Sequence, residues 1–366
     1  MYHETVLEIH LDHLTHNYYF LKSKLQKDVK FMAVVKATGY GSDAVVVAKH
    51  LEALKVDYFA VAYTQEAIQL RQHGITTPIL ILHPQPCNFE KIISNKLVPS
   101  LYNLQVLKKF IETVKEQNSK QHPVHLKFNT GLHRIGLDPG DIGSCYQLIS
   151  ETNAVKVEGI LSHLAASEDL NEIEFTRTQI KRFQTIVTEA TRLFDSISLI
   201  HQSNTSGILN FPEAHFNMVR SGIGLYGFGN DPRYDKNLKP ITSLKSVITQ
   251  INKLKTGESL GYNRAFIAKE PTITATIAIG HADGISRTFG NKNGYVWIHD
   301  QKAFILGNVC MDMLMVDVTQ IECEQGDEVI LFDANHNAAK MAEFAGTISY
   351  ELLTAISPRV KRKIVS

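Results

Sequence analysis

The chain has 366 residues, of which 44% are hydrophobic and 20% are charged; this composition is typical of a globular protein and excludes a disordered or fibrous chain. A formal net charge of +1 gives no electrostatic reason to expect binding to nucleic acid or to an anionic membrane surface. The length allows two domains with cores of their own, and no apolar stretch approaches the roughly 18 residues that predict a membrane span.

Short apolar segments with strand character alternate with amphipathic helical patterns through about residue 230. The clearest helical pattern places apolar residues at intervals of three and four from Ile180 to Phe194. The predicted strands are Val29–Lys36, Tyr58–Tyr63, Pro78–His83, Val98–Tyr102, Val124–Asn129, Val157–His163, Ser198–Ser203 and Asn217–Arg220. A closed (β/α)8 barrel requires eight such strands with intervening helices, so we predict a TIM barrel over residues 11–236. An open doubly wound sheet is the alternative, but no Gly-x-Gly-x-x-Gly follows an early strand.

After about Pro240 the pattern changes to short segments rich in Val, Ile and Thr, separated by Gly, Asn and Asp. The predicted strands here are Thr272–Ile279, Gly294–His299, Ala303–Leu306, Met313–Val318 and Glu328–Phe332. They predict a mostly antiparallel β domain, and Lys340–Ser357 returns to a helical pattern. Val6–His10 alternates like a strand but precedes the barrel, so we expect it to pair with this second domain, assigned to residues 1–10 and 237–366.

The amino terminus and the cysteines favour a cytoplasmic protein. The first ten residues contain no basic region followed by an apolar one, so we expect no secretory signal. The four cysteines, Cys87, Cys145, Cys310 and Cys323, have no metal-ligand spacing and are typical of reduced thiols. We therefore expect no metal site and no disulfide framework.

Lys36 is the first candidate for chemistry, because it ends an apolar strand and is followed at once by Ala37-Thr-Gly-Tyr-Gly41. Desolvation at such a position lowers a lysine pKa and makes the amine a nucleophile for carbonyls such as that of pyridoxal. The structural alternative is a strand-end lysine that snorkels to solvent or pairs with a carboxylate.

Further polar residues fall at the same predicted end of the strands, where barrel enzymes collect their active residues. They are Tyr40, Lys127, Arg134, His163, the segment His201-Gln-Ser-Asn-Thr205, Arg220, Gly222 and Ile223. Each has a structural alternative, such as a core histidine, a solvated basic patch, a helix cap or an ion pair. Together, cations, hydroxyls and glycine amides at one end of the strands favour an anionic cofactor that carries a phosphate.

Eight segments, in order along essentially the whole chain, resemble motifs of the alanine racemase family. They are Ala33-Val-Val-Lys-Ala-Thr-Gly-Tyr-Gly41, Lys127-Phe-Asn-Thr-Gly-Leu-His-Arg-Ile-Gly136, Gly159-Ile-Leu-Ser-His163, Asn217-Met-Val-Arg-Ser-Gly-Ile-Gly-Leu-Tyr-Gly227, Gly261-Tyr-Asn-Arg264, Ile279-Gly-His-Ala-Asp-Gly284, Val309-Cys-Met-Asp312 and Ile348-Ser-Tyr-Glu351. The first resembles the segment to which pyridoxal phosphate is attached in that family. No single segment is specific for this family, whereas the occurrence of all eight in the family's order is.

The resemblance implies that Lys36 carries pyridoxal phosphate and is one of two catalytic bases. Tyr262 is then the second base, on the opposite face of the substrate. In the family this tyrosine comes from the other subunit, so the resemblance implies a homodimer with shared active sites. Two flanking bases also make chemical sense, because racemisation removes a proton from one face of a carbon and delivers one to the other. A tyrosine can act as a base only if nearby cations lower its pKa.

The remaining roles are likewise implied by the resemblance. Positions that match the phosphate site are Tyr40, Asn204, Thr205, Gly222, Ile223 and Tyr350. Arg220 is expected to face the pyridine nitrogen with His201 behind it, and His163 to lie beside the ring. Arg134 and the Met311 amide are expected to receive the substrate carboxylate, and Asp312 to lie near Tyr262.

Three positions depart from the commoner family pattern. His281 stands where many members have tyrosine, and Asn308 where arginine often precedes the Cys-Met-Asp motif, both near the substrate entrance. Substrate selectivity is therefore less determined by the sequence than the reaction type. Asn129 replaces an aspartate often found two residues after the lysine that corresponds to Lys127. That lysine is carbamylated in some relatives; here a carbamylated, a chloride-bridged and a free Lys127 all stay open.

The sequence thus predicts a cytoplasmic, homodimeric member of this family that interconverts L-alanine and D-alanine, and the family relation implies a supply of D-alanine for peptidoglycan. A serine or broader-specificity racemase stays open, because a few pocket contacts set substrate choice. A non-catalytic pyridoxal phosphate carrier would need only the barrel, and the β domain with Tyr262 argues against it. A barrel-type decarboxylase of basic amino acids would show a Gly-rich phosphate loop and a Cys-x-x-x-Asp segment, and we find neither.

Overall fold

The computed structural model describes residues 4–365, and these form two compact units. The barrel unit contains Thr15–Gly39 and Ala44–Leu238. The β unit contains residues 4–14, Tyr40–Asp43 and residues 239–365. Residues 1–3 and 366, which the sequence analysis assigned to the second domain, lie outside the described residues.

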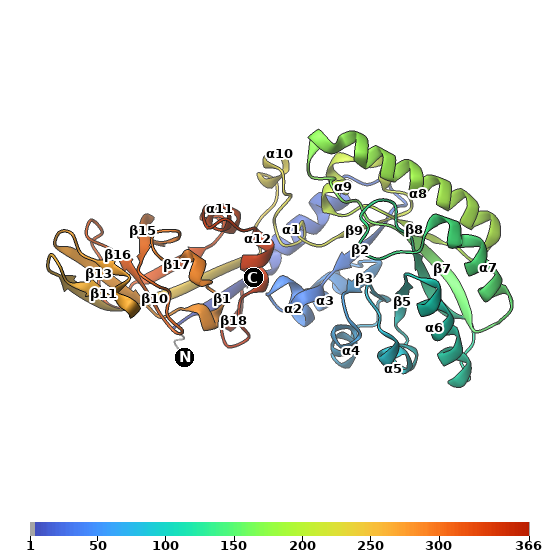
Figure 1. The fold of residues 1–366 in the computed structure, drawn as a ribbon, viewed down its shortest axis with the longest axis horizontal. Coiled ribbons are helices and arrows are strands. Elements are labelled where there is room, and N and C mark those ends of the chain that lie inside the picture. The colour runs from blue at the N-terminus through green and yellow to red at the C-terminus, as the bar shows by residue number, and fades with distance from the viewer. Residues whose placement is uncertain (1–3, 366) are drawn as a thin grey trace. The chain divides into compact units, whose positions relative to one another are not determined.

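The barrel unit is built on a sheet of eight parallel strands, shown in Figure 1. They are β2 (Lys30–Val34), β3 (Tyr58–Val61), β4 (Ile79–Ile81), β5 (Val98–Leu101), β6 (His122–Lys127), β7 (Val155–Leu161), β8 (Leu199–His201) and β9 (Met218–Ser221). Neighbouring strands follow the chain from β2 to β8, and β9 pairs with β2. The Arg220 N–H donates to the Ser203 carbonyl at 3.1 Å and links β9 to the segment after β8. The predicted (β/α)8 barrel and all eight of its strands are confirmed.

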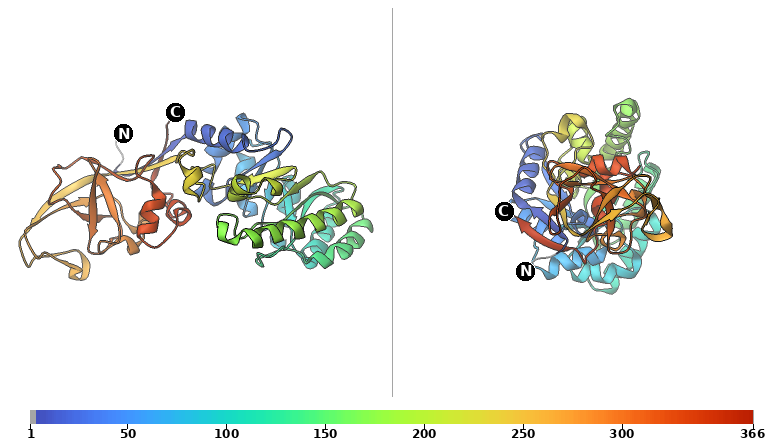
Figure 2. Two further views of the ribbon diagram at one scale, coloured as in Figure 1. Left: turned by 90° about the horizontal axis from the view of Figure 1, so that it is seen from above. Right: turned by 90° about the vertical axis from the view of Figure 1, so that its left-hand side faces the viewer.

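Helices cover the outside of these strands (Figures 1 and 2). The helices of this part of the chain are α1 (Leu11–Lys22), α3 (Ala44–Ala53), α4 (Thr64–Gln72), α5 (Phe89–Ser94), α6 (Leu104–Glu116), α7 (Ile142–Ser150), α8 (Ile173–Leu193), α9 (Thr205–Asn210) and α10 (Pro232–Asp235). The short segment α2 (Lys36–Tyr40) has left-handed backbone angles and is a turn, not a regular helix. Short 3-10 helices lie at Pro86–Asn88, Pro139–Asp141, Leu170–Glu172 and Pro212–Ala214. The helix predicted from Ile180 to Phe194 is confirmed as α8, which buries Ile180, Phe183 and Ala190.

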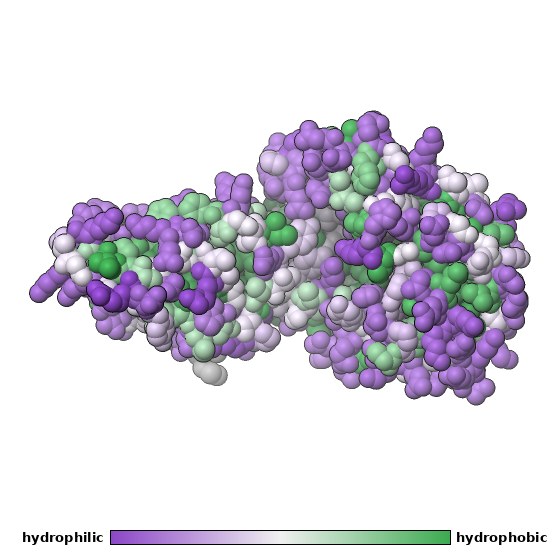
Figure 3. Space-filling view, in the orientation of Figure 1, coloured by the Kyte–Doolittle hydropathy of each residue, from purple (hydrophilic) through white to green (hydrophobic). Residues whose placement is uncertain are grey.

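Strands β3, β4 and β5 are buried at every residue, because parallel strands of a barrel are covered on one face by helices and on the other by the interior. This is why β3 and β4 appear in the sequence as continuous apolar runs rather than as alternating patterns. Hydrophilic residues dominate the face of this unit seen in Figure 3 and apolar ones are scattered among them, which is ordinary for a globular surface.

The β unit is a mostly antiparallel sheet of eight strands, in the order β13-β16-β15-β14-β17-β10-β1-β18. Its strands are β1 (Val6–His10), β10 (Thr242–Leu254), β13 (Thr272–Ile277), β14 (Tyr295–Ile298), β15 (Gln301–Leu306), β16 (Leu314–Asp317), β17 (Glu328–Phe332) and β18 (Lys361–Val365). Strand β10 also pairs with β13, so the six strands from β13 to β10 close on themselves. A two-stranded hairpin, β11 (Ser259–Leu260) with β12 (Phe266–Ile267), extends this unit.

The predicted place of Val6–His10 is confirmed: β1 pairs antiparallel with β10 and parallel with β18. The sequence analysis missed β10 and β18, because both carry many polar residues that remain accessible to solvent. The helical pattern of Lys340–Ser357 corresponds to two helices, α11 (Ala338–Phe344) and α12 (Ser349–Thr354). Gly346, at a φ of 74°, separates them in the left-handed region that glycine adopts readily.

Short 3-10 helices in the β unit lie at Tyr262–Arg264, His281–Asp283 and Arg287–Phe289. Within residues 4–365, no helix is long and apolar enough to cross a lipid bilayer.

Candidate active site

The residues singled out from the sequence fall in both units. The barrel unit holds Lys36, Lys127, Arg134, His163, His201, Asn204, Thr205, Arg220, Gly222 and Ile223. The β unit holds Tyr40, Tyr262, Met311, Asp312 and Tyr350.

Lys36 lies two residues after the end of β2 and is followed by a left-handed turn. Ala37, Thr38 and Tyr40 have φ values of 52°, 54° and 52°, and Gly39 between them has 65°. Each non-glycine residue in this region costs about 1–2 kcal/mol, so the turn persists only because its surroundings hold it. Strained backbone of this kind is typical of functional sites, and the turn stands at the carboxyl end of the strand, where barrel enzymes act.

Burial lowers the pKa of Lys36, the nearby Arg134 lowers it further, and Glu66 opposes both. The direction of this shift agrees with the desolvation expected for Lys36 at this strand end. A larger fraction of the amine is neutral at a given pH than for a lysine in water, which makes Lys36 a better nucleophile and base.

A cluster of cationic side chains surrounds this lysine. Burial, together with Arg220, Arg134 and Lys36, lowers the pKa of Lys127 to about 7, and Lys127 is only 6% exposed. Burial and then Arg220 hold the pKa of His163 well below its usual value, so His163 is neutral at pH 7. The structure thus brings Lys36, Arg134 and Arg220 within electrostatic reach of Lys127 and His163. An anionic ligand would relieve the repulsion among the lysine and arginine side chains.

Arg220 is 4% exposed and nearly all its donors are engaged. Nη1 donates to His201 Nδ1 at 2.7 Å and to the His201 carbonyl at 3.1 Å. Nη2 donates to the Ser162 and Gln202 carbonyls at 2.8 and 3.1 Å and to His163 Nδ1 at 3.0 Å. Within the described chain the Nε–H donor has no protein acceptor. It is available to an acceptor such as a ring nitrogen. Burial and Arg134 lower the pKa of Arg220 to about 9, so the guanidinium keeps its proton at pH 7.

A hydrogen-bonded chain continues behind Arg220. Because Arg220 donates to His201 Nδ1, we place the His201 proton on Nε2, which lies 2.9 Å from His125 Nδ1. The His125 proton then lies on Nε2 and faces Glu158 Oε2 at 3.5 Å, where it makes no hydrogen bond. The Tyr58 hydroxyl donates to the same oxygen at 3.0 Å. The donors of Arg220 and His201 thus point toward His125 and Glu158. Burial holds the pKa of His201 well below its usual value, so this histidine stays a neutral acceptor for Arg220.

Asn204 and Thr205 begin α9 and are tied to neighbouring side chains. Asn204 Oδ1 accepts the Gly207 N–H at 2.8 Å and the Ser167 hydroxyl at 2.7 Å, which is the helix cap that the sequence offered as the structural alternative. The Thr205 hydroxyl lies 3.0 Å from that of Ser221. Gly222 and Ile223 follow at once after β9 and form its closing turn, where the Leu225 N–H donates to the Gly222 carbonyl at 2.8 Å.

In the β unit the rings of Tyr40 and Tyr350 lie together, with centroids 6.1 Å apart. Burial raises the pKa of Tyr40, so its phenol stays protonated. Gly41 has a φ of 82°, and a Cβ there would meet the Leu353 carbonyl oxygen at 1.9 Å, so only glycine allows this close approach to α12. Arg362 donates to the Gly41 carbonyl at 2.8 Å and fixes the turn that presents Tyr40.

Tyr262 and Met311 are exposed in the chain, at 74% and 57%. The Asn308 side-chain amide donates to the Tyr262 carbonyl at 3.3 Å, so one of the family departures contacts the backbone of the predicted base. The Ala282 N–H donates to the Met311 carbonyl at 3.0 Å, which ties the segment of His281 to the Cys-Met-Asp motif.

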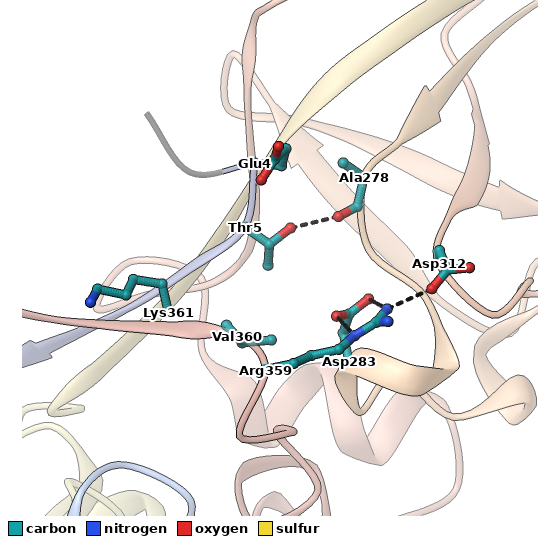
Figure 4. A pocket seen from close by; sticks show the side chains of 8 residues that line it. All are labelled: Glu4, Thr5, Ala278, Asp283, Asp312, Arg359, Val360 and Lys361. Atoms are coloured by element: carbon teal, nitrogen blue, oxygen red, sulfur yellow. Dashed lines mark hydrogen bonds and ion pairs between the residues drawn. The ribbon is translucent and has the colours of Figure 1, made fainter. Parts of the chain in front are cut away.

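Asp312 is paired with Arg359, a residue that the sequence analysis did not select (Figure 4). Arg359 Nη2 donates to Asp312 Oδ1 at 2.9 Å, and Arg359 Nε donates to Asp283 Oδ1 at 2.6 Å. The three side chains line a polar pocket of the β unit together with Glu4, Thr5, Ala278, Val360 and Lys361. The Arg359–Asp283 pair spans 76 positions along the chain, and no local pattern marks it.

His125, Glu158 and Glu66 were also missed from the sequence. His125 stands two positions before Lys127 in β6, on the same face of the strand, and this spacing could have revealed it. Glu158 and Glu66 gave no comparable signal. Among residues 4–365, no three His, Cys, Asp or Glu side chains are arranged to hold a metal ion, and the four cysteines are free thiols.

Comparison with known proteins gives one consistent result. The family model for the alanine racemase N-terminal domain matches residues 9–230, and that for the C-terminal domain matches residues 241–364. A curated relative, alanine racemase 1 of Caldanaerobacter subterraneus subsp. tengcongensis, is 35% identical over 98% of this chain and 94% of its own.

Two solved structures extend the comparison. The alanine racemase of Clostridium difficile 630 has a TM-score of 0.93 at 35% identity and covers 100% of this chain and 96% of its own. The alanine racemase of Bartonella henselae, solved with covalently bound pyridoxal phosphate, has a TM-score of 0.90 at 26% identity and covers 100% of both chains.

Proposed function

The chain belongs to the alanine racemase family, and from that premise we propose that it is a pyridoxal phosphate-dependent isomerase that interconverts L-alanine and D-alanine. The observation that carries the proposal is a desolvated Lys36 at the barrel mouth, which acts on Lys127 and His163 together with a buried Arg220 that retains one unpartnered donor. A Bartonella relative with bound pyridoxal phosphate supports the choice of cofactor.

The residues fit this cofactor. When bound, pyridoxal phosphate supplies an electron sink that makes the α-proton of an amino acid acidic enough to remove. Lys36 would offer the amine that holds the aldehyde carbon, and the Arg220 Nε–H would be available to the ring nitrogen, with the neutral His163 beside the ring. Groups proposed to bind the phosphate are Tyr40, Asn204, Thr205, Gly222, Ile223 and Tyr350. The cationic cluster supplies the positive field that an anionic cofactor needs.

We propose Lys36 as the base on one face of the substrate and Tyr262 of the partner subunit as the base on the other. The Tyr262 side chain is 74% exposed in its own chain, so a second copy of the protein has access to it. This supports a role on that copy, where the phenol would lie within the hydrogen-bonding distance of the substrate proton that a general base needs. Asp312, which pairs with Arg359, is proposed to lie near Tyr262. Arg134 and the Met311 amide are proposed to receive the substrate carboxylate.

Arg220 keeps its proton, and this predicts which side reaction the site suppresses. A pyridine nitrogen that only accepts a hydrogen bond withdraws less electron density from the substrate than a protonated one. The weaker withdrawal disfavours transamination. Replacing Arg220 with Glu is therefore expected to lower kcat for racemisation about 100-fold and to raise pyruvate formation from alanine. Both rates are measured on the same sample, by chiral analysis and by a coupled pyruvate assay. An unchanged ratio of pyruvate formed to alanine racemised would contradict this role.

The lowered pKa of Lys127 predicts an unusual dependence of protein stability on pH. Its folded-state pKa of about 7 lies below the ordinary value of 10.5, so between these values the folded protein binds fewer protons than the unfolded one. The free energy of unfolding therefore rises with pH over this interval. Lys127→Met lacks this penalty, and its Tm without cofactor is expected to exceed that of the wild type by on the order of 5 °C at pH 6 and by less at pH 9.

The control for this series is Lys156→Met, which changes an exposed lysine of β7 and is expected to give no pH-dependent difference. A difference in Tm between Lys127→Met and the wild type that is the same at pH 6 and pH 9 would show that Lys127 is not desolvated.

The entrance residues leave a second substrate to be tested. His281 and Asn308 stand where tyrosine and arginine are commoner in the family, and Asn308 contacts Tyr262 directly. The test measures kcat/KM for racemisation of L-serine and of L-alanine on the same preparation and compares the two values. A ratio near one would favour the broader-specificity racemase.

We further propose that the protein works in the cytoplasm and supplies D-alanine for peptidoglycan. Its four free thiols suit a reducing compartment. Expression in a bacterium that needs added D-alanine for growth tests the second statement, and failure of the active enzyme to support growth would contradict it.

A further inference from the structure

We propose that Glu66 is a positioning residue for Lys36: its carboxylate holds the left-handed turn that follows the lysine and so fixes where the lysine amine lies. The inference rests on the function proposed for Lys36, and nothing in the sequence analysis assigned a role to Glu66.

Glu66 ties the loop after β2 to the loop after β3. It occupies the third position of α4, and its Oε1 accepts the Ala37 N–H at 2.6 Å. Oε2 accepts the N–H groups of Ala62 and Tyr63 at 2.8 and 2.9 Å. Strands β2 and β3 are parallel neighbours, so one carboxylate joins the two loops at the same end of the barrel.

The turn needs such an anchor. Ala37 and Thr38 are both exposed and both have left-handed φ values, which non-glycine residues adopt only under constraint. The Ala37 amide is the first backbone donor after Lys36. A charged acceptor at this amide gives a stronger hydrogen bond than a neutral one. Loss of the anchor would let residues 37 and 38 relax to ordinary backbone angles and turn the lysine side chain away.

Glu66 also acts on the charge of Lys36. Among the influences on the Lys36 ammonium, burial and Arg134 lower its pKa, whereas the Glu66 carboxylate raises it. Glu66 therefore limits how far the lysine pKa falls. Removing the negative charge should move the pKa of Lys36 further down, in addition to loosening the turn.

The geometry predicts that glutamine cannot replace Glu66, although the two side chains have the same size. Both oxygens of Glu66 only accept hydrogen bonds from backbone N–H groups. In Glu66→Gln one of these positions becomes an NH2 group, a donor facing a donor, whichever way the amide is turned. Oε1 accepts one N–H group and Oε2 accepts two, so the NH2 group is expected at the Oε1 position, and the turn at Ala37 loses its anchor.

The chain offers a matched control in Glu52. This residue of α3 accepts the N–H groups of Thr76 and Thr77, both at 2.8 Å. It is likewise a helix carboxylate that anchors backbone amides in the barrel unit, but its partners precede β4 instead of following a strand. All of these bonds are accepted by Glu52 Oε1, so the amide oxygen of Glu52→Gln can keep them. Glu52→Gln therefore removes the charge of a helix carboxylate without touching the segment after Lys36.

The test compares wild type, Glu66→Gln and Glu52→Gln by two measurements. Hydrogen exchange of the peptide covering residues 36–41, in protein freed of cofactor, is expected to be about tenfold faster in Glu66→Gln only. With pyridoxal phosphate added, the pH midpoint of its attachment to Lys36, followed by visible absorbance, is expected to fall in Glu66→Gln only. Racemase kcat should drop by about 10–100-fold in this variant, with KM changed much less.

The outcomes separate the two proposals. Equal exchange rates in the 36–41 peptide and equal pH midpoints for Glu66→Gln and Glu52→Gln would overturn the role of Glu66. If the wild type fails to bind pyridoxal phosphate, the proposed function fails, yet the exchange measurement still decides whether Glu66 holds the turn. Should Glu66→Gln not fold, Glu66→Asp serves instead: its shorter carboxylate keeps the charge, so faster exchange with a nearly unchanged pH midpoint is expected, and wild-type exchange would overturn the proposal.

Discussion

Lys36→Ala is expected to remove measurable racemisation of alanine, with kcat lowered by about 10⁴-fold or more. The substitution removes both a covalent attachment point and a general base, and each of these alone contributes several orders of magnitude. The visible absorbance that pyridoxal phosphate gains on attachment to a lysine should also be lost. Chiral analysis of the alanine product and an absorbance spectrum of the purified protein measure the two effects.

Lys30→Ala is the matched control for this prediction. Lys30 begins the same strand, β2, and is exposed, so its replacement removes a lysine at the other end of the strand and should leave both readings unchanged. Persistence of attached cofactor in Lys36→Ala would place the attachment at another lysine and would refute the assignment.

Tyr262→Phe is expected to give a defect that depends on which enantiomer is offered. Exchange of the α-proton of L-alanine in D2O should fall by about 10²–10⁴-fold, because the acceptor on that face is lost. Exchange of the α-proton of D-alanine should fall much less, because Lys36 is retained. Net inversion falls equally in both directions, since a catalyst cannot change the equilibrium constant. NMR of both exchange reactions measures the effect, with Tyr146→Phe, at an exposed tyrosine of α7, as control.

Mixed subunits test whether Tyr262 acts across a dimer. Lys36→Ala and Tyr262→Phe chains are each inactive alone, but a dimer of one with the other contains one site with both native residues if the site is shared. Random reassortment makes half the dimers mixed, so about a quarter of the wild-type activity should return. No recovery after proven exchange of subunits would place both bases in one chain.

Absence of α-proton exchange with any amino acid in the wild type, despite attached cofactor, would favour a non-catalytic carrier.

Much of the fold followed from local patterns. Barrel strands such as β3 and β4 are apolar because both their faces are covered. The strands of the β unit could be found as short segments rich in Val, Ile and Thr between turn residues. Strand β10 escaped because it carries polar residues toward its exposed end. Strand β18, Lys361–Val365, escaped because it is a charged strand at the edge of its sheet.

The candidate site was predicted in part for a similar reason. Residues at the carboxyl ends of parallel barrel strands meet at one end of the barrel, so Lys36, Lys127, His163 and Arg220 could be grouped from their positions alone. Their protonation could not. The pKa of about 7 for Lys127 depends on burial and on three neighbouring cations, and a one-dimensional pattern contains neither.

The sequence by itself determined the order of the elements, the residues that end each barrel strand, and through its motifs the family. Only the tertiary structure decided which side chains meet behind those strand ends. Glu66 reaches Ala37 across 29 positions, and the hydrogen bonds from Arg220 through His201 to His125 depend on the registers of β6 with β7 and of β7 with β8. Periodicity reports burial along one element, whereas hydrogen-bond direction, backbone strain and charge depend on neighbours that only the folded chain brings together.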